Sequence, residues 1–194
     1  MENLIVFLDK LIGIRDGHGN SHGRQVNLLA SALAQKIDFP QSDLINLEYA
    51  ASIHDIGKVT VNEFIINKAG RLTEAEYIMI QQHTALGHKL VEPLGLPQLI
   101  MDVILSHHEN YDGSGYPNGL AGEEIPLAAR IIRITDTYDA LTSNRGYRPA
   151  FSRKQALDIM ENESGHFDPD LLYVFMKIKI SHKFSRPGDI PRHL

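Results

Sequence analysis

The sequence predicts an all-α fold, and three observations support this prediction. Apolar residues recur at helical spacing along most of the 194 residues, for example at Val26, Leu29 and Leu33. Residues that commonly cap helices stand at the start of several of these stretches. No internal repeat, low-complexity tract or flexible linker divides the chain. One compact domain is therefore expected over residues 1–180, followed by a C-terminal tail at 181–194.

The helical pattern occurs in successive stretches, which are residues 4–14, 21–37, 42–56, 73–91, 97–107, 126–142 and 154–162, with a last helix from residue 168. Ser42 is placed to cap the third helix, and Gly57 to end it. Thr73 and Glu76 have the spacing of a capping box, which predicts the start of the fourth helix. Pro97 suits the first turn of the fifth.

Two segments between these helices are expected to differ from them. Residues 59–72 contain β-prone residues such as Val59, Val61 and Ile65, which indicate a short extended piece. Residues 111–124 are rich in glycine and contain a proline, so regular structure is not expected there. Long glycine-rich loops in compact domains are often functional. The second segment is therefore a candidate functional loop.

The composition narrows the classes of function. A formal net charge of −5 argues against general binding to nucleic acids or to anionic membranes. Apolar runs such as Leu4 to Leu8 are too short to cross a bilayer, and Asp9 interrupts this one, so a cytoplasmic protein is expected. The absence of cysteine excludes disulfides and iron–sulfur clusters, and it leaves nitrogen and oxygen ligands for any metal.

Ten histidines stand out in this composition, because histidine is the commonest metal ligand. His18 and His22 lie four residues apart, which is consistent either with a shared metal or with a chance pair. His54 and Asp55 follow an apolar helix, where an imidazole and a carboxylate need a partner if they are buried. Lys58 lies one turn beyond Asp55, so it is placed to neutralise a phosphate oxygen or to protonate a leaving group.

Further candidate ligands follow along the chain. His83 lies on a helix with an apolar face, and the pair His107-His108 directly precedes the glycine-rich loop. Asp136 interrupts an apolar segment, where it needs a metal or an ion pair with a basic residue such as Arg133. Together the candidates exceed what one ion of four- to six-fold coordination accepts. Two ions are expected, with three as the alternative, and two neighbouring metals form a template for phosphoryl transfer.

These residues form a pattern that resembles the HD-GYP family, a branch of the HD metal-dependent phosphohydrolases. The resemblance runs from about Arg15 to Phe175, and its most specific stretch is Asp112 to Leu120, which contains the GYP signature. The other markers are, in order, Arg15-Asp16, His22, His54 to Lys58, His83 with Gly87, His107 to Glu109, Arg130-Ile131 with Asp136, Tyr138 to Ser143, Arg145, Tyr147-Arg148 and Phe167 to Pro169.

The resemblance implies an HD-domain helical bundle with an added GYP loop and C-terminal helices. It implies a metal-dependent phosphodiesterase that hydrolyses cyclic di-GMP, a bacterial second messenger, to pGpG and on to GMP, by attack of a metal-bridging hydroxide. It also implies two metal ions, with iron expected and manganese as a substitute. Diguanylate cyclase (GGDEF) domains are the candidate protein partners. The oligomeric state stays open, because the apolar stretch from Leu4 to Ile14 packs either on the core or on a second copy of the chain.

The resemblance also assigns roles to particular residues. The implied metal ligands are His22, His54, Asp55, His83, His107, His108 and Asp136. Lys58 contacts the bound phosphate, and Gly115 and Tyr116 border the substrate. Arg145 and Arg148 reach its phosphates or guanine groups, a role that suits the planar fork of arginine.

Three positions leave alternatives open. Asp139, three residues after the metal ligand Asp136, either orients water or relays a proton, with Asp55 and Lys58 as the other catalytic groups, or it is a structural cap. His18 stands where many members have tyrosine or glutamate, so it either binds a third ion or only hydrogen-bonds near the site. A glycine after Arg145, where proline is frequent, should loosen the arginine-bearing loop and weaken substrate affinity more than metal binding.

Two other functions remain as alternatives to cyclic di-GMP hydrolysis. One is a non-catalytic module that binds cyclic di-GMP or contacts a cyclase, and the complete ligand set argues against it. The other is a hydrolase of another cyclic dinucleotide, such as cyclic GMP-AMP, which the same metals would cleave. Turnover and substrate competition separate these three possibilities.

Overall fold

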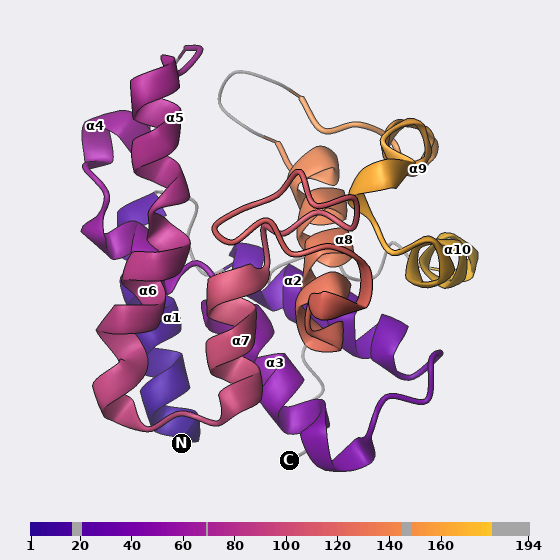
Figure 1. Ribbon diagram of the computed structural model, residues 1–194, viewed down its shortest axis with the longest axis horizontal. Helices are drawn as coiled ribbons and strands as arrows, with labels where there is room; N and C mark the ends of the chain where they lie inside the picture. Colours follow the sequence, from indigo (N-terminus) through magenta and orange to yellow (C-terminus); the bar gives the residue numbers. More distant parts are fainter. Residues whose placement is uncertain (17–20, 69, 145–148, 180–194) are drawn as a thin grey trace.

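The protein consists of helices and loops within the residues that the computed structural model describes, 1–16, 21–68, 70–144 and 149–179. The α-helices are α1 (Glu2–Asp16), α2 (Ser21–Ala34), α3 (Leu44–Ile53), α4 (Glu63–Ile66), α5 (Glu74–Gln81), α6 (His83–Val91), α7 (Gln98–Ser106), α8 (Leu127–Thr142), α9 (Arg153–Asn162) and α10 (Pro169–Lys177). Figure 1 shows α4, α5 and α6 on one side of the bundle and α8, α9 and α10 on the other. The predicted all-α class is confirmed.

The centre of the bundle is formed by α2, α3, α7 and α8. α2 packs along α3 and against α8, and α7 packs against both α3 and α8. Small residues such as Ala30 and Ala50 are fully buried, so neighbouring helices approach closely, and Ile104 and Ile131 fill the space between them. Removing this apolar surface from water is the main favourable contribution to folding. The ends of these four helices are thereby held at defined positions.

Local capping signals begin two of the helices as the sequence predicts. The hydroxyl of Thr73 accepts from the backbone N–H of Glu76 at 3.3 Å, and the carboxylate of Glu76 accepts from the backbone N–H of Thr73 at 2.7 Å, which completes the capping box of α5. Asp168 caps α10 by accepting from two backbone N–H groups. Pro97 stands one position before α7 rather than within its first turn.

Ser42 and Gly57 do not have the roles predicted for them. Ser42 lies inside a 3-10 turn, Gln41–Asp43, and α3 begins after it without a side-chain cap. Gly57 does not end α3, which stops at Ile53, but lies in a second 3-10 helix, Ile56–Thr60. A Cβ at Gly57 would come within 1.8 Å of a backbone oxygen of α6. The glycine is needed because two helical segments touch there.

Gly57 and Gly87 form this crossing between the 3-10 helix and α6. A Cβ on Gly57 would meet the carbonyl oxygen of His83, and a Cβ on Gly87 would lie 2.9 Å from the backbone nitrogen of Gly57. Only glycine permits such an approach of two backbones. As a result, the first residue of α6, His83, lies beside the His54-Asp55 segment, as expected of ligands of one metal centre. The crossing of the two glycines that brings them together was not predicted.

Two predicted elements differ from the structure. The helix expected over residues 73–91 is divided at Gln82 into α5 and α6. The extended piece expected in residues 59–72 is absent, and this segment holds the end of the 3-10 helix and the short α4 instead. β-propensity reflects packing on a sheet, and the described residues form no strand for this segment to join.

No helix among the described residues is both long enough and apolar enough to span a membrane. His18, Arg145, Arg148 and the tail at 181–194 lie outside the described residues, and so do the predictions made for them.

Candidate metal centre

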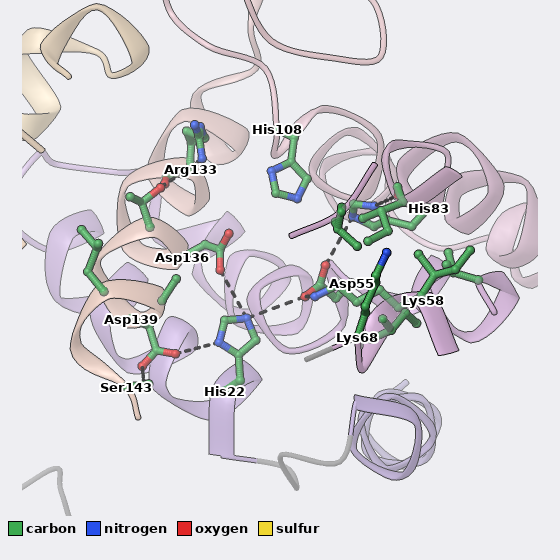
Figure 2. A pocket seen from close by; sticks show the side chains of 18 of the residues that line it. His22, Asp55, Lys58, Lys68, His83, His108, Arg133, Asp136, Asp139 and Ser143 are labelled. Atoms are coloured by element: carbon green, nitrogen blue, oxygen red, sulfur yellow. Dashed lines mark hydrogen bonds and ion pairs between the residues drawn. The ribbon is translucent and has the colours of Figure 1, made fainter. Parts of the chain in front are cut away.

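A cavity of about 870 Å³ opens beside the ends of the central helices. Figure 2 shows side chains of α2 and α8 on one side of it and those of the 3-10 helix and α6 on the other. Val61, Ile65, Leu72 and Ile80 make part of the wall apolar. The polar and charged wall residues are His22, Gln25, Asp55, Lys58, Lys68, His83, His108, Tyr116, Arg133, Asp136, Thr137, Asp139, Ser143 and Asn144.

The seven described residues predicted as metal ligands come from five places in the fold. These are the start of α2 (His22), the end of α3 (His54 and Asp55), the start of α6 (His83), the end of α7 (His107 and His108) and the middle of α8 (Asp136). Their ligand atoms form two groups, each with all atoms within 4.8 Å of one another. We call them the Asp55 group, which is Asp55, His83, His107 and His108, and the Asp136 group, which is His22, His54 and Asp136.

Asp55 contacts both groups, because one carboxylate oxygen faces the imidazoles of its own group and the other faces those of the Asp136 group. Oδ1 is 3.4 Å from Nε2 of His83 and 3.7 Å from Nε2 of His107. Oδ2 is 3.4 Å from Nε2 of His54 and 3.7 Å from Nε2 of His22. A carboxylate in this position is able to bridge two ions, as in sites whose metals lie about 3.5–4 Å apart.

Three of the histidines are oriented by the backbone. Nδ1 of His54, His83 and His107 lies 2.9, 2.7 and 3.0 Å from a backbone carbonyl oxygen three or four residues earlier. Because a carbonyl only accepts, each neutral ring carries its proton on Nδ1, and Nε2 keeps its lone pair. Such a bond on the far nitrogen fixes the tautomer and the ring orientation of a metal ligand.

The lone pairs on Nε2 fit a metal ion. Nε2 of His83 and Nε2 of His107 are only 3.2 Å apart, and both rings are buried. Two nitrogen ligands bound to one ion at about 2.0–2.1 Å lie roughly 3 Å from each other. Nε2 of His54 is also buried and has no hydrogen-bond partner among the described residues. A buried nitrogen without a partner is unfavourable, so the donor set suits divalent cations.

His22 is oriented by a carboxylate instead of the backbone. Its Nδ1 lies 2.7 Å from Oδ2 of Asp139, and its Nε2 lies 3.3 Å from Oδ1 of Asp136. The hydroxyl of Ser143 donates to the other oxygen of Asp139 at 3.2 Å. Figure 2 shows Asp139 and Asp136 on either side of the ring. The position of Asp139 is that of a group that holds a metal-binding histidine; its predicted part in proton transfer stays a prediction.

Burial and neighbouring charges shift the pKa values of the cluster. Burial opposes protonation of His22, but its bonds with two carboxylates raise its pKa to about 10. Burial and the adjacent imidazoles lower the pKa of His107 to about 4. Burial opposes ionisation of Asp55, yet the Nζ of Lys58, 2.6 Å from Oδ2, holds the pKa of this carboxyl well below its usual range. Charged carboxylates and neutral imidazoles are the forms that bind metals, so Asp55 and His107 are in the binding form, whereas His22 has to lose a proton when it binds an ion.

The glycine-rich loop is anchored on the backbone that follows α7. A Cβ at Gly115 would lie 2.2 Å from the backbone nitrogen of Asn110, so only glycine fits there. The buried carboxylate of Glu109 accepts from the backbone N–H of Asn118 at 2.7 Å and of Leu120 at 3.1 Å. The pair of glycine and glutamate thus fixes the loop beside the cavity.

Tyr116, the central residue of the GYP signature, lines the cavity, whereas Gly115 lies against the backbone behind it. The ring of Tyr116 stacks on His108, with centroids 4.8 Å apart and planes 24° apart. Burial raises the pKa of the Tyr116 hydroxyl, so it stays protonated and able to donate. The tyrosine therefore presents a hydrogen-bond donor next to the Asp55 group.

The sequence reading did not select Gln25, Lys68 or Arg133, although all three line the cavity. Arg133 was considered only as an ion-pair partner for Asp136, whose oxygen instead faces two histidines. The available signal was its position three residues before Asp136, on the same face of α8. Lys68 lies within residues 59–72, where a short extended piece was expected, so nothing in the sequence indicated that it lines the cavity.

Comparisons with known proteins add to this geometry. A family model described as an HD domain matches residues 7–171. A cyclic di-GMP phosphodiesterase of Pseudomonas aeruginosa is 38% identical over 163 residues, which are 84% of this chain and 39% of that protein. The 3′3′-cGAMP-specific phosphodiesterase 3 of Vibrio cholerae is 34% identical over 178 residues, which are 91% of this chain and 39% of that protein.

A solved structure of an HDGYP protein from Bdellovibrio bacteriovorus has a similar fold. The TM-score is 0.67 at 21% sequence identity, and the match covers 80% of this chain and 50% of that one. The chain spans less than half the length of the two curated relatives described above.

Proposed function

Because the chain belongs to the HD domain family, in its HD-GYP branch, we propose that it is a metal-dependent phosphodiesterase that hydrolyses cyclic di-GMP. The products are pGpG and, after a second cleavage, GMP. The observation that carries the proposal is Asp55, whose two oxygens face two sets of imidazole nitrogens inside one cavity. At about 870 Å³ the cavity has the size of a site for a small organic ligand.

We propose one metal ion in each ligand group, iron in the first place and manganese as its substitute. Donor sets of imidazole and carboxylate, without thiolate, suit both metals. When bound, the two ions activate water as the nucleophile and neutralise charge on the phosphoryl oxygens. The alternative is a third ion, held with the help of His18, and the number of ions per chain distinguishes the two cases.

The protein side chains around the centre then bind and orient the phosphodiester. Lys58 lines the cavity next to Asp55, where its ammonium group stabilises charge that develops on a phosphoryl oxygen or on the departing 3′ oxygen. Tyr116, which lines the same cavity beside His108, donates its hydroxyl to the phosphate. Asp139 holds the ring of His22 in one orientation, so a ligand of the Asp136 group is in place before substrate arrives.

Two further assignments belong to the same proposal. Arg145 and Arg148 contact the phosphates or guanine groups of the substrate. Diguanylate cyclase (GGDEF) domains are the protein partners, and the cytoplasm is the location.

Turnover by the purified chain tests the proposal. The protein is prepared without chelators under reducing conditions, and its iron and manganese are counted by plasma emission spectrometry. We expect about two ions per chain and conversion of cyclic di-GMP to pGpG or GMP. Chelation should stop the reaction, and Fe²⁺ or Mn²⁺ should restore it. Full metal occupancy with tight binding of cyclic di-GMP but no conversion would instead identify a non-catalytic binding module.

Cyclic GMP-AMP is the second candidate substrate, because one relative that is 34% identical is named for its specificity toward 3′3′-cGAMP. The metal centre does not distinguish the two nucleotides, since both carry the same phosphodiesters. Competition between them in one reaction gives the ratio of their kcat/KM values directly. A ratio above one for cyclic di-GMP supports the first candidate, and a ratio below one replaces it by the second.

A further inference from the structure

Arg133 lines the cavity from α8, one helical turn before Asp136. Residues three apart on a helix share a face, with a rise of about 4.5 Å between them. Figure 2 shows Arg133 on the side of α8 and His108, across the cavity from Lys58 and Lys68. The guanidinium group therefore lies beside the metal centre without belonging to either ligand group.

Neutral partners hold the guanidinium in place. Its Nε donates to the side-chain oxygen of Asn110 at 3.0 Å, and its Nη1 donates to the hydroxyl of Thr137 at 3.0 Å. Its central carbon lies 5.6 Å from the centre of the Phe167 ring. Within the described part of the chain, Nη2 has no hydrogen-bond partner. A side chain that is oriented in advance loses less conformational entropy when it binds a ligand.

The two lysines of the cavity wall, in contrast, contact carboxylates. The Nζ of Lys58 lies 2.6 Å from Oδ2 of Asp55. The Nζ of Lys68 lies 2.6 and 2.8 Å from the two carboxylate oxygens of Glu76. Arg133 forms no ion pair with any carboxylate of the described residues. Its partly buried positive charge is thus open to an anion from outside the protein.

We propose that Arg133 binds the phosphate of the cyclic dinucleotide that is not being cleaved. This rests on the proposed function, because a cyclic dinucleotide carries two phosphates and the metal centre takes one of them. The other phosphate then needs a cation within the same cavity, displaced from the metals. The planar fork of arginine matches two phosphate oxygens, and Nη2 is the donor left for them. Arg133 is therefore a determinant of affinity for substrates with two phosphates.

An arginine also recognises guanine, through O6 and N7, so the test has to separate phosphate from base. GMP makes this separation, since it carries guanine but only one phosphate, and as an end product it should compete with substrate. A contact to the second phosphate is absent from the GMP complex. A contact to guanine is present in it.

The experiment compares Arg133→Gln with the wild type, using the full chain loaded with Mn²⁺. We expect kcat/KM for cyclic di-GMP to fall roughly 10- to 100-fold, mainly through KM, which is the range for losing a hydrogen bond to a charged group. The inhibition constant of GMP should change less than about twofold, and the metal content should match the wild type. Arg133→Lys should recover part of the loss because it keeps the charge.

Asn110→Ala supplies the structural control, because it removes the partner of Nε and leaves the guanidinium. If Arg133 only links α8 to the loop, Arg133→Gln and Asn110→Ala should weaken the binding of cyclic di-GMP and of GMP to the same extent. Both variants should then also lower the melting temperature. Lys154→Gln removes an exposed cation on α9, paired with Asp158, and should leave turnover unchanged.

The proposal is overturned if Arg133→Gln keeps kcat/KM for cyclic di-GMP within twofold, or if the inhibition constant of GMP rises with KM. A wild type that hydrolyses no cyclic dinucleotide refutes the proposed function instead, which is a separate result.

Discussion

The closed end and the open mouth of the cavity are built in different ways. At the closed end, His83 and His107 are buried, and backbone carbonyls orient their rings. At the mouth, the side chains of Lys68 and Arg133 are held by other side chains and are partly or largely exposed. The imidazoles of the closed end are therefore positioned by the helix backbone, whereas Lys68 and Arg133 are positioned by other side chains. Changes at the two ends should consequently affect different quantities.

Helix ends explain the rigidity of the metal centre. Nδ1 of His54 donates to a backbone carbonyl near the end of α3, that of His83 to one near the end of α5, and that of His107 to one near the end of α7. The carbonyl that binds His107 also accepts from the backbone N–H of the same residue at 3.0 Å. Each ring is thereby oriented by the helix backbone, and its Nε2 is aimed at the metal site.

Asp55→Asn should have the largest effect, because it removes the charge that bridges the two groups. We expect turnover to fall more than about 100-fold, beyond the 10- to 100-fold typical of lost outer partners, and metal content to drop. Plasma emission spectrometry and a turnover assay measure both. Asp102→Asn on α7, whose carboxylate only accepts from Gln98, is the matched control. Wild-type metal content together with wild-type turnover in Asp55→Asn would refute the assigned site.

Asp139→Asn tests whether a carboxylate behind His22 matters as much as the carbonyls behind the other rings. The amide still accepts from Nδ1 but carries no charge, so we expect metal affinity to fall about 10- to 100-fold. Competition with a fluorescent chelator gives this affinity. Ser143→Ala removes only the hydroxyl that donates to Asp139, so its metal affinity should decrease clearly less. An unchanged affinity with a lower kcat would favour proton transfer by Asp139 instead.

Glu109→Gln addresses the glycine-rich loop, which carries Tyr116 at the cavity wall. The amide offers one acceptor to backbone N–H groups at Asn118 and Leu120, so one N–H should lose its bond. We expect the free energy of unfolding to fall by about 1–3 kcal/mol, measured by urea denaturation. Glu124→Gln changes an exposed carboxylate of the same loop and should cost much less. Equal losses in both variants would argue against a special role for the buried glutamate.

Lys68→Gln should have the smallest effect, because its ion pair with Glu76 is exposed and such pairs contribute little. KM for cyclic di-GMP is expected to change less than about threefold, with kcat and metal content unchanged. Steady-state kinetics at low and physiological salt provide the measurement. A tenfold rise in KM would instead place Lys68 in direct contact with substrate.

The sequence predicted the start of a helix correctly where neighbouring residues alone determine it. The capping box of Thr73 and Glu76 and the cap at Asp168 act within a few residues, and α5 and α10 begin where these signals predict. Gly57 was misread because its cause is a backbone contact with His83, far along the chain. The break at Gln82 was missed as well, since the apolar pattern continues across it.

The sequence by itself determined the all-α class and the kinds of ligand available, because helical periodicity and residue chemistry are local properties. It also placed the pairs His54-Asp55 and His107-His108 at the ends of predicted helices, and His83 and Asp136 within them. Only the tertiary structure decided that the oxygens of Asp55 face different groups, that Asp139 lies behind His22, and that Arg133 lacks a carboxylate partner in the described chain. These relations depend on how distant helices cross, which residue spacing along one chain does not specify.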